Sequence, residues 1–183
     1  KRKIILNVGR LEQQKDHLTL IEAFSKIAPS FSDWDLRIIG EGSLKNTLEK
    51  KITSLNLINR VFLSGITKHI ESEYIQADLF VVSSIYESFG LVTAEAMSFG
   101  LPCLGFKDCP GTRDLIIHEK NGILVNGSSN RSLSLAKGLS RLILDKKLRI
   151  NLGNSGKEII NTKFSDKEVA NSWEDLLYNA IKS

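Results

Sequence analysis

The chain has 183 residues, of which 42% are hydrophobic and 25% are charged. Its length suits one domain with a substantial core, and its composition is that of a globular protein. The net charge is +4, but the basic residues are spread along the chain. A nucleic-acid-binding protein would gather them on one surface among aromatic residues, so we exclude nucleic acid as a partner. Attraction to an anionic membrane surface remains a weaker option.

No apolar stretch approaches the length of a membrane-spanning helix. Cys103 and Cys109 lack the C-x-x-C spacing of a metal or redox site, which predicts reduced thiols in a cytoplasmic protein. The three histidines are isolated, and no carboxylates cluster with the spacing of a metal site. We therefore expect no metal and no other cofactor.

Short apolar runs, mostly β-branched, alternate with amphipathic helical patterns along the chain. Strands are predicted over residues 4–8, 36–39, 61–63, 79–82, 103–106 and 123–125. Because these strands are apolar throughout, the pattern indicates a parallel sheet covered by helices on both faces. We predict an α/β fold with a doubly wound, mostly parallel six-stranded sheet, forming a single domain over residues 1–183.

Two helices without another strand are predicted at the C-terminal end, over about 146–160 and 166–181. Trp173, Leu176, Leu177 and Ile181 recur at helical spacing, and we expect them to dock the final helix on the domain. The chain enters its first strand almost at once, which suggests a domain cut from a longer protein.

Ligands of such sheets lie outside the carboxyl ends of the strands. Arg10 and Lys15 follow the first strand, and two cations at that position suit a diphosphate. Gly40 and Gly42 follow the second strand and allow close approach of the backbone. Taken alone, the cations can be ordinary surface charges and the glycines a plain turn.

The loop after the fourth strand opens a helix whose first N–H groups and positive dipole end can bind an anion. Glu87 lies at the mouth of this helix, and Glu95 lies inside it among apolar residues. A buried carboxylate on an apolar helix is costly unless a partner satisfies it. Both residues also have a purely structural alternative. Glu87 can merely complement the positive end of the helix dipole, and Glu95 can be a structural acid paired with a buried arginine.

All these residues fall at one edge of the predicted sheet. Residues 87–95, with the sequence ESFGLVTAE, resemble the E-x7-E signature of group 1 (family 4) glycosyltransferases, which are retaining, nucleotide-sugar-dependent enzymes of the GT-B fold. Gly9-Arg10-Leu11 with Lys15 is similar to a second hallmark of that family. Further matches follow in order at residues 40–42, 62–65, 96–102 and 121–125. The resemblance covers essentially the whole chain and implies the Rossmann-like, donor-binding C-terminal half of such an enzyme.

The resemblance implies catalytic roles for Arg10, Lys15 and Glu87. The two cations would bind the donor's diphosphate and stabilise it as it leaves, while Glu87 would hydrogen-bond hydroxyls of the transferred sugar. The partner is then a nucleotide sugar linked to UDP or GDP, and the hexose stays undetermined. No metal is needed, because the cations and the helix end do the neutralising.

The resemblance also implies a set of residues that bind the donor. Glu95 would take the ribose hydroxyls, and Ile66 and Thr67 would lie against the base. The whole substrate-binding set is Glu95, Ser88, Phe89, Gly90, Leu91, Ile66, Thr67, Gly40 and Gly42. The chain departs from the family at Lys15-Asp16, where Lys-Gly is usual, and over residues 108–114, where many members have Gly-Gly-x-Pro-Glu.

The family's N-terminal half, which binds the acceptor and closes over the donor, is absent from this sequence. We therefore expect the chain alone to transfer little or no sugar. The full enzyme would include that N-terminal domain and work in the cytoplasm, with peripheral association at the inner face of the membrane left open. A glycan, a lipid-linked glycan and a small molecule all remain candidate acceptors.

Three other functions compete with this one. A nucleotide-sugar epimerase of the same architecture would share phosphate binding but needs acid and base residues that the sequence does not identify. A pyridine-nucleotide oxidoreductase is disfavoured because Lys45 stands where the third glycine of the dinucleotide fingerprint belongs. A non-catalytic nucleotide-sugar-binding module stays open.

Overall fold

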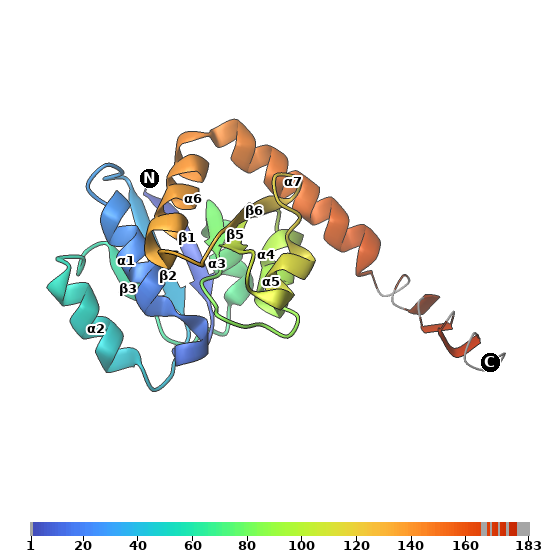
Figure 1. The fold of residues 1–183 in the computed structure, drawn as a ribbon, viewed down its shortest axis with the longest axis horizontal. Helices are drawn as coiled ribbons and strands as arrows, with labels where there is room; N and C mark the ends of the chain where they lie inside the picture. Colours follow the sequence, from blue (N-terminus) through green and yellow to red (C-terminus); the bar gives the residue numbers. More distant parts are fainter. Residues whose placement is uncertain (1, 166–167, 169, 172, 175, 179–183) are drawn as a thin grey trace.

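A single sheet of six strands lies at the centre of the protein (Figure 1). The computed structural model describes residues 2–165, 168, 170–171, 173–174 and 176–178. Every pair of neighbouring strands is parallel, and the order is β3-β2-β1-β4-β5-β6. The strands are β1 (Lys3–Val8), β2 (Trp34–Ile39), β3 (Val61–Leu63), β4 (Leu79–Val81), β5 (Cys103–Phe106) and β6 (Gly122–Val125). The predicted doubly wound α/β sheet is confirmed.

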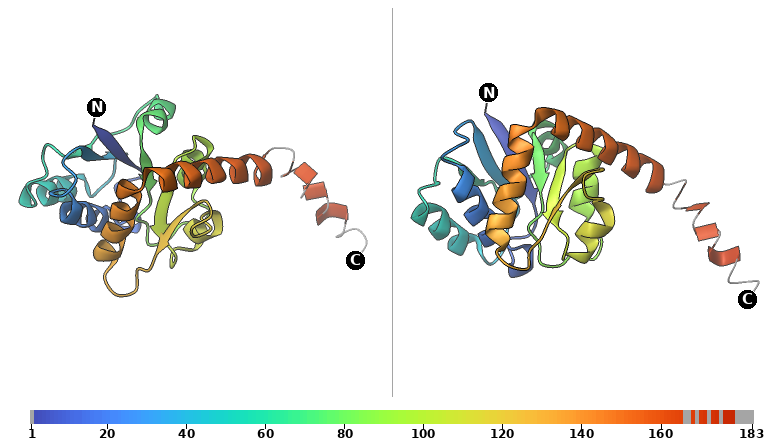
Figure 2. Two further views of the ribbon diagram at one scale, coloured as in Figure 1. Left: turned by 90° about the horizontal axis from the view of Figure 1, so that it is seen from above. Right: turned by 45° about the horizontal axis from the view of Figure 1, so that its top comes forward.

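Helices cover both faces of this sheet. They are α1 (His17–Ile27), α2 (Lys45–Ser54), α3 (Ile70–Gln76), α4 (Leu91–Ser98), α5 (Pro110–Leu115), α6 (Arg131–Leu144) and α7 (Lys146–Lys163), with a 3-10 turn η1 (Gln13–Lys15) before α1. Helix α6 stands beside α1 on one face, and α7 crosses to pack along α4 on the other (Figures 1 and 2).

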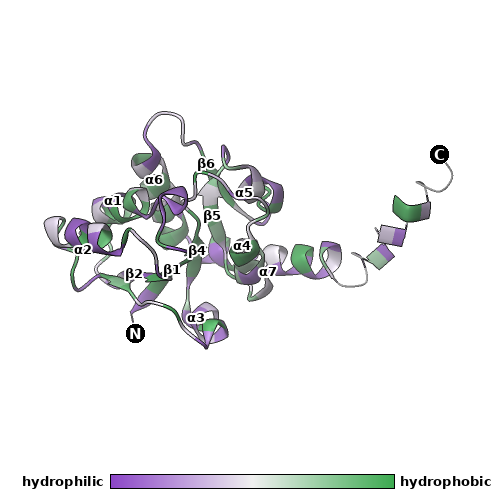
Figure 3. Ribbon diagram, turned by 90° about the horizontal axis from the view of Figure 1, so that it is seen from below, coloured by the Kyte–Doolittle hydropathy of each residue, from purple (hydrophilic) through white to green (hydrophobic). Residues whose placement is uncertain are grey.

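The core divides into two layers because successive residues of a strand point to opposite faces. Ile5 of β1 and Val81 of β4 pack with the apolar sides of α1, α2 and α6. Leu6 and Phe80, their neighbours in sequence, pack with α3 and α4. In Figure 3 the strands are coloured largely as hydrophobic, whereas the helices around them carry both hydrophobic and hydrophilic residues. Burial on both sides explains why the strands read as apolar runs.

Helix α7 lies directly on the backbone at the end of α4. A Cβ added at Gly153 would be only 2.0 Å from the Gly100 carbonyl oxygen, so no side chain fits there. Gly156, one turn later, has room: its Cβ would be 3.4 Å from the Cγ of Met97. The two helices therefore touch without an intervening side chain.

The prediction for the C-terminal end is wrong in part. Trp173, Leu176 and Leu177 are 61%, 60% and 56% exposed, so they do not dock on the domain, and Ile181 lies outside the described residues. Helix α7 already packs along α4, and its end at Lys163 points away from the sheet (Figure 1). Among the described residues, no helix combines the length and apolar character that crossing a membrane requires.

Candidate functional site

A cavity of about 680 Å³ opens at the carboxyl ends of β1 and β4. The strand order reverses between these two strands, and ligands of doubly wound sheets bind at that point. The volume is within the range of small-molecule sites. We call this cavity the switch-point pocket. Its lining residues are Val8, Gly9, Arg10, Gln14, Lys15, Ile39, Gly40, Glu41, Ile66, Thr67, Ile70, Glu87, Ser88, Phe89, Gly90, Leu91 and Val92.

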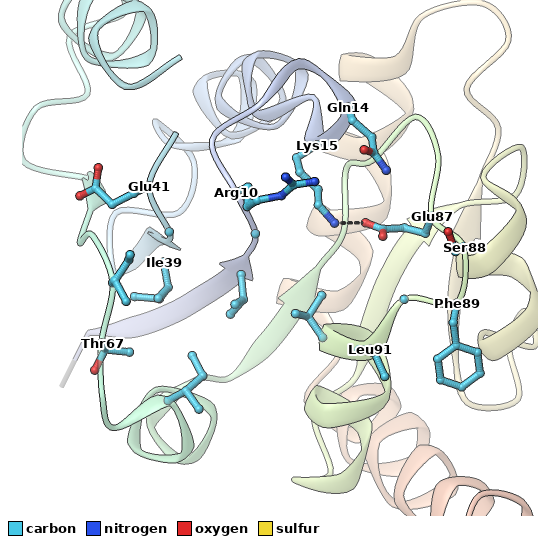
Figure 4. A pocket seen from close by; sticks show the side chains of 17 residues that line it. Arg10, Gln14, Lys15, Ile39, Glu41, Thr67, Glu87, Ser88, Phe89 and Leu91 are labelled. Atoms are coloured by element: carbon cyan, nitrogen blue, oxygen red, sulfur yellow. Dashed lines mark hydrogen bonds and ion pairs between the residues drawn. The ribbon is translucent and has the colours of Figure 1, made fainter. Parts of the chain in front are cut away.

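An ion pair joins the two halves of the switch-point pocket. Lys15 Nζ lies 2.5 Å from Glu87 Oε1, although 72 residues separate them in sequence. Both side chains are largely buried, with 16% and 9% exposed, and their pairing offsets part of the cost of removing them from water. Ser84 Oγ donates a second hydrogen bond to Glu87 Oε1 at 2.6 Å. Arg10, which is exposed, extends beside Lys15, while Glu41 and Thr67 lie on the opposite wall (Figure 4).

The loop after β1 holds Lys15 through its backbone. Lys15 ends the turn η1, and its carbonyl accepts a hydrogen bond from Ser83 Oγ at 2.7 Å. Asp16 then adopts a left-handed conformation, with φ of 49°, and α1 begins at the next residue. His17 is fully buried, and its Nε2 lies 3.0 Å from Asn7 Oδ1. Burial, and then the charge of Lys15, lowers the pKa of His17 to about 4, so this histidine is neutral and structural.

The loop after β4 is fixed at both of its sides. The Ile85 N–H donates to the Gln14 carbonyl at 2.9 Å, and Gln14 Nε2 returns a bond to the Tyr86 carbonyl at 2.8 Å. On the other side, the Gly111 N–H donates to the Glu87 carbonyl at 3.0 Å. A Cβ on Gly111 would lie 2.6 Å from that same oxygen. Residues 108–114, where the sequence departs from the pattern that it otherwise resembles, include most of α5, which therefore supports the Glu87 loop.

The loop ends at Gly90, whose φ of 87° suits a glycine and directs the chain into α4. The first N–H groups of a helix have no intrahelical partner, and those of α4 begin at Leu91, which lines the pocket. Phe89 also lines the pocket and packs edge-on against Phe164, with 5.5 Å between ring centroids. A helix N-terminus thus faces the same cavity as Lys15 and Glu87.

The two glycines after β2 allow their loop to pack closely against the loop after β1. A Cβ at Gly40 would lie 2.0 Å from the Gly9 carbonyl oxygen, and one at Gly42 would lie 2.5 Å from the Leu11 carbonyl oxygen. Gly40 lines the switch-point pocket, but Gly42 does not. The close approach expected from these glycines is therefore between two backbone segments of the protein.

Glu95 is exposed, and the expectation that it is buried is wrong. Helix α4 turns Ala96 and Met97 into the core, which leaves Glu95 on the outer side. Its Oε2 accepts a hydrogen bond from the hydroxyl of Tyr74 at 2.7 Å. Glu95 is not among the residues that line the pocket, yet it lies one turn after Leu91 on the same helix face. Its role at a ribose stays a prediction.

The structure brings together ten of the twelve predicted site residues and adds others. The ten are Arg10, Lys15, Gly40, Ile66, Thr67, Glu87, Ser88, Phe89, Gly90 and Leu91. Sequence reasoning missed Gln14 and Glu41 in the lining, although both lie inside motifs that it had identified. It also missed Ser84 and Tyr74, for which only the contacts of the folded chain give a signal. Within the described residues, no three His, Cys, Asp or Glu side chains are grouped closely enough to hold a metal.

Comparison with known proteins gives a consistent family match. The family model described as "Glycosyl transferases group 1" matches residues 1–159. A Campylobacter jejuni protein, N-acetylgalactosamine-N,N'-diacetylbacillosaminyl-diphospho-undecaprenol 4-alpha-N-acetylgalactosaminyltransferase, is 33% identical over 86% of this chain and 42% of its own length. The chain spans about half or less of the length of the curated relatives it matches.

Two solved structures extend the comparison. A mutant of TarM from S. aureus, in complex with fondaparinux, alpha-GlcNAc-glycerol and UDP, superposes with a TM-score of 0.88 at 29% identity, over 96% of this chain and 35% of TarM. The C-terminal domain of LpcC, a group 1 family protein from Francisella tularensis, gives a TM-score of 0.81 at 29% identity, over 90% of this chain and 87% of that chain.

Proposed function

Because the chain belongs to the group 1 glycosyl transferases, we propose that it is the donor-binding domain of a retaining enzyme that transfers a hexosyl unit from a nucleotide sugar. The observation that carries this proposal is the Lys15–Glu87 pair, which stands beside Arg10 at the N-terminus of α4. One cavity thereby offers cations to a diphosphate and a carboxylate to sugar hydroxyls.

The residues of the pocket suit the departure of a nucleoside diphosphate. Arg10 presents a planar fork and Lys15 a compact charge, and the dipole of α4 adds positive potential in the same place. Charge that develops on the leaving diphosphate is stabilised most by groups that are already in position. Ser84 and Lys15 both hold the Glu87 carboxylate in place, so it meets the sugar hydroxyls with little reorganisation. These cations replace a metal ion in the proposal.

The wall opposite Glu87 suits the nucleoside. Ile66 offers an exposed apolar side chain there, and Thr67 stands next to it. UDP is the first nucleotide to test, because the TarM complex contains UDP, and GDP is the alternative. Gly40 belongs to the same half of the pocket.

Acceptor binding and closure over the donor would come from a preceding domain of a longer protein. The fraction of the curated relatives that the chain covers supports this division, as does its match to a C-terminal domain that was solved alone. The whole enzyme would act on a glycan, a lipid-linked glycan or a small molecule in the cytoplasm, with or without peripheral membrane contact. The present chain alone would bind donor and transfer little sugar.

Calorimetric titration of the chain with UDP, GDP and ADP tests the proposal. We expect one diphosphate to bind, and Lys15→Ala to weaken its binding by about tenfold or more, the cost of losing a charge-assisted hydrogen bond. Lys137→Ala is the matched control, since Lys137 is exposed on α6. Absence of binding to all three nucleotides, or equal losses in both variants, would contradict the proposal. Isomerised sugar from the full-length protein and donor alone would indicate an epimerase.

A further inference from the structure

Arg131, the first residue of α6, makes contacts with three loops at once. Its Nε lies 3.1 Å from Asp16 Oδ2 in the loop after β1, and its Nη1 lies 3.1 Å from Asp108 Oδ2 in the loop after β5. Its Nη2 donates to the carbonyls of Ser83 and Ser84, in the loop after β4, at 3.1 and 3.2 Å. The guanidinium therefore uses each of its three nitrogens, and it does not line the switch-point pocket.

The protein is shaped around this side chain. The guanidinium carbon lies 3.7 Å from the centroid of the Phe106 ring, a distance at which the cation and the ring attract each other. A Cβ on Gly127 would lie 2.6 Å from Arg131 Nη1 and 2.7 Å from Asp108 Oδ2, so a larger residue there would require the ends of these two side chains to shift. Only 23% of the Arg131 side chain is exposed. A planar fork with donors on three sides fits these acceptors, and a lysine ammonium cannot reach them all.

Arg131 binds the loops after β1 and β4 at residues that also support the Lys15–Glu87 ion pair. Asp16 follows Lys15 directly, and Ser83 donates through Oγ to the Lys15 carbonyl. Ser84 donates through Oγ to Glu87 Oε1. Arg131 thus holds the two chain segments that carry Lys15 and Glu87, although it contacts neither of these two side chains.

Asp16 shows why such a support is needed. It adopts the left-handed conformation with φ of 49°, which glycine accepts freely and other residues adopt at a cost. The bond from Arg131 to its carboxylate stabilises the turn that directs Lys15 into the pocket. The side chain of Asp16 therefore supplies an attachment point that a glycine would lack.

We propose that Arg131 is a positioning residue, which holds the loops of Lys15 and Glu87 at the spacing needed to bind donor. The consequence for donor binding rests on the proposed function, whereas the effect on Lys15 and Glu87 does not. The alternative is that Arg131 contributes only to overall stability. The two readings differ in what happens to Lys15 when Arg131 is replaced.

Chemical labelling of Lys15 separates them. The full chain, without nucleotide, is treated briefly with acetic anhydride, and the acetylation of each lysine is measured by peptide mass spectrometry, with the exposed Lys137 of α6 as internal reference. We expect Arg131→Ala to raise the labelling of Lys15 relative to Lys137 by about tenfold, because loops that Arg131 no longer holds would weaken the charge-assisted bond between Lys15 and Glu87. Arg131→Lys, which keeps the charge and the stem, should give an intermediate increase. Calorimetry with UDP should show the same order of affinities.

Arg141→Ala is the matched control, because Arg141 lies on the same helix and pairs with the exposed Glu119. It should leave the labelling of Lys15 and the affinity for UDP unchanged. A lower thermal midpoint for Arg131→Ala with unchanged relative labelling would overturn the proposal. If Arg131→Ala fails to fold, unchanged labelling in Arg131→Lys overturns it equally. Failure of the unmodified chain to bind any nucleotide refutes the proposed function, and the labelling result still decides the role of Arg131.

Discussion

The hydroxyl of Tyr74 donates a hydrogen bond to the carboxylate of Glu95, with 2.7 Å between Oη and Oε2. Tyr74 is buried and stacks on Phe99 with 5.3 Å between ring centroids, so the ring is a fixed support for an exposed acid. Burial, and then the bond to Glu95, raises the pKa of Tyr74 well above its ordinary value, which keeps the hydroxyl a donor. Glu95 is therefore held in one orientation at the edge of α4.

Glu95→Gln should weaken the binding of free nucleoside diphosphate as well as of nucleotide sugar. The proposed partner is the ribose, and a hydrogen bond to a charged group is worth about 1.5–3 kcal/mol, so the loss is about ten- to a hundredfold. Tyr74→Phe should give a smaller loss, because it removes only the support. Calorimetry with UDP or GDP measures both. An unchanged affinity for Glu95→Gln would return this residue to a structural role.

Glu87→Gln should leave nucleoside diphosphate binding nearly unchanged, because Glu87 is proposed to contact the sugar. Loss of its charge also frees Lys15 from the ion pair, which favours the diphosphate if it has any effect. In the full-length enzyme, turnover should fall by roughly a hundredfold or more, as when one preorganised electrostatic group is removed. Equal losses of UDP affinity in Glu87→Gln and Glu95→Gln would refute the division of roles.

Removal of divalent metal should not change nucleotide affinity. The charges proposed to meet the diphosphate are Arg10 and Lys15, and the described residues include no group of three metal-ligating side chains. Titrations of UDP in EDTA and in magnesium, at matched ionic strength, should give the same dissociation constant. Binding that disappears with EDTA and returns with magnesium would show that the cations are insufficient.

The free energy of unfolding should decrease at acidic pH because of the lowered pKa of His17. Its pKa is lowered from 6.5 to about 4. Below about pH 6.5, His17 is therefore protonated in the unfolded chain while it stays neutral in the folded chain. This contribution is complete above pH 6.5 and is lost as the pH falls towards 4, by about 3 kcal/mol in total. Urea unfolding at about pH 7.5 and pH 5 should show a smaller pH dependence in His17→Gln. His69→Gln, at an exposed site, should behave like the unmodified protein; a His17→Gln variant that does so too would contradict the assignment.

Gly153→Ala and Gly156→Ala should change stability in opposite directions although both lie in α7. Alanine at 153 would meet the Gly100 carbonyl oxygen, and overpacking of this kind costs about 1–3 kcal/mol. Alanine at 156 makes only ordinary contacts, so its better helix propensity should stabilise the protein by up to about 1 kcal/mol. Thermal unfolding of both variants tests this, and equal shifts would show that α7 adjusts its position freely.

The sheet could be predicted because each strand can be recognised from its own short stretch of sequence. Each strand is an apolar run bounded by turn residues, and burial on both faces leaves few polar interruptions. Arg10, Lys15 and Glu87 could be placed together because parallel strands bring their carboxyl ends to one edge. The distance between Lys15 and Glu87 could not be predicted, since it depends on the path of two loops.

The errors came from residues whose surroundings are set by distant segments. The apolar neighbours of Glu95 in sequence predict a buried residue, but α4 turns Ala96 and Met97 into the core and leaves Glu95 exposed. Trp173 shares the helical spacing of a buried residue and is exposed. Arg131 is 115 residues from Asp16, and nothing in the local pattern distinguishes it from a surface arginine at the start of a helix.

The contact between Gly153 and Gly100 limits how the site can move. Because Gly153 packs against the backbone just after α4, α7 supports that end of the helix, and the loop that carries Glu87 joins β4 at one end and α4 at the other. A short loop attached at both ends can move only a little. The contacts of the same loop with Gln14, Gly111 and Arg131 restrict Glu87 further, so a group that meets Glu87 must come to this loop.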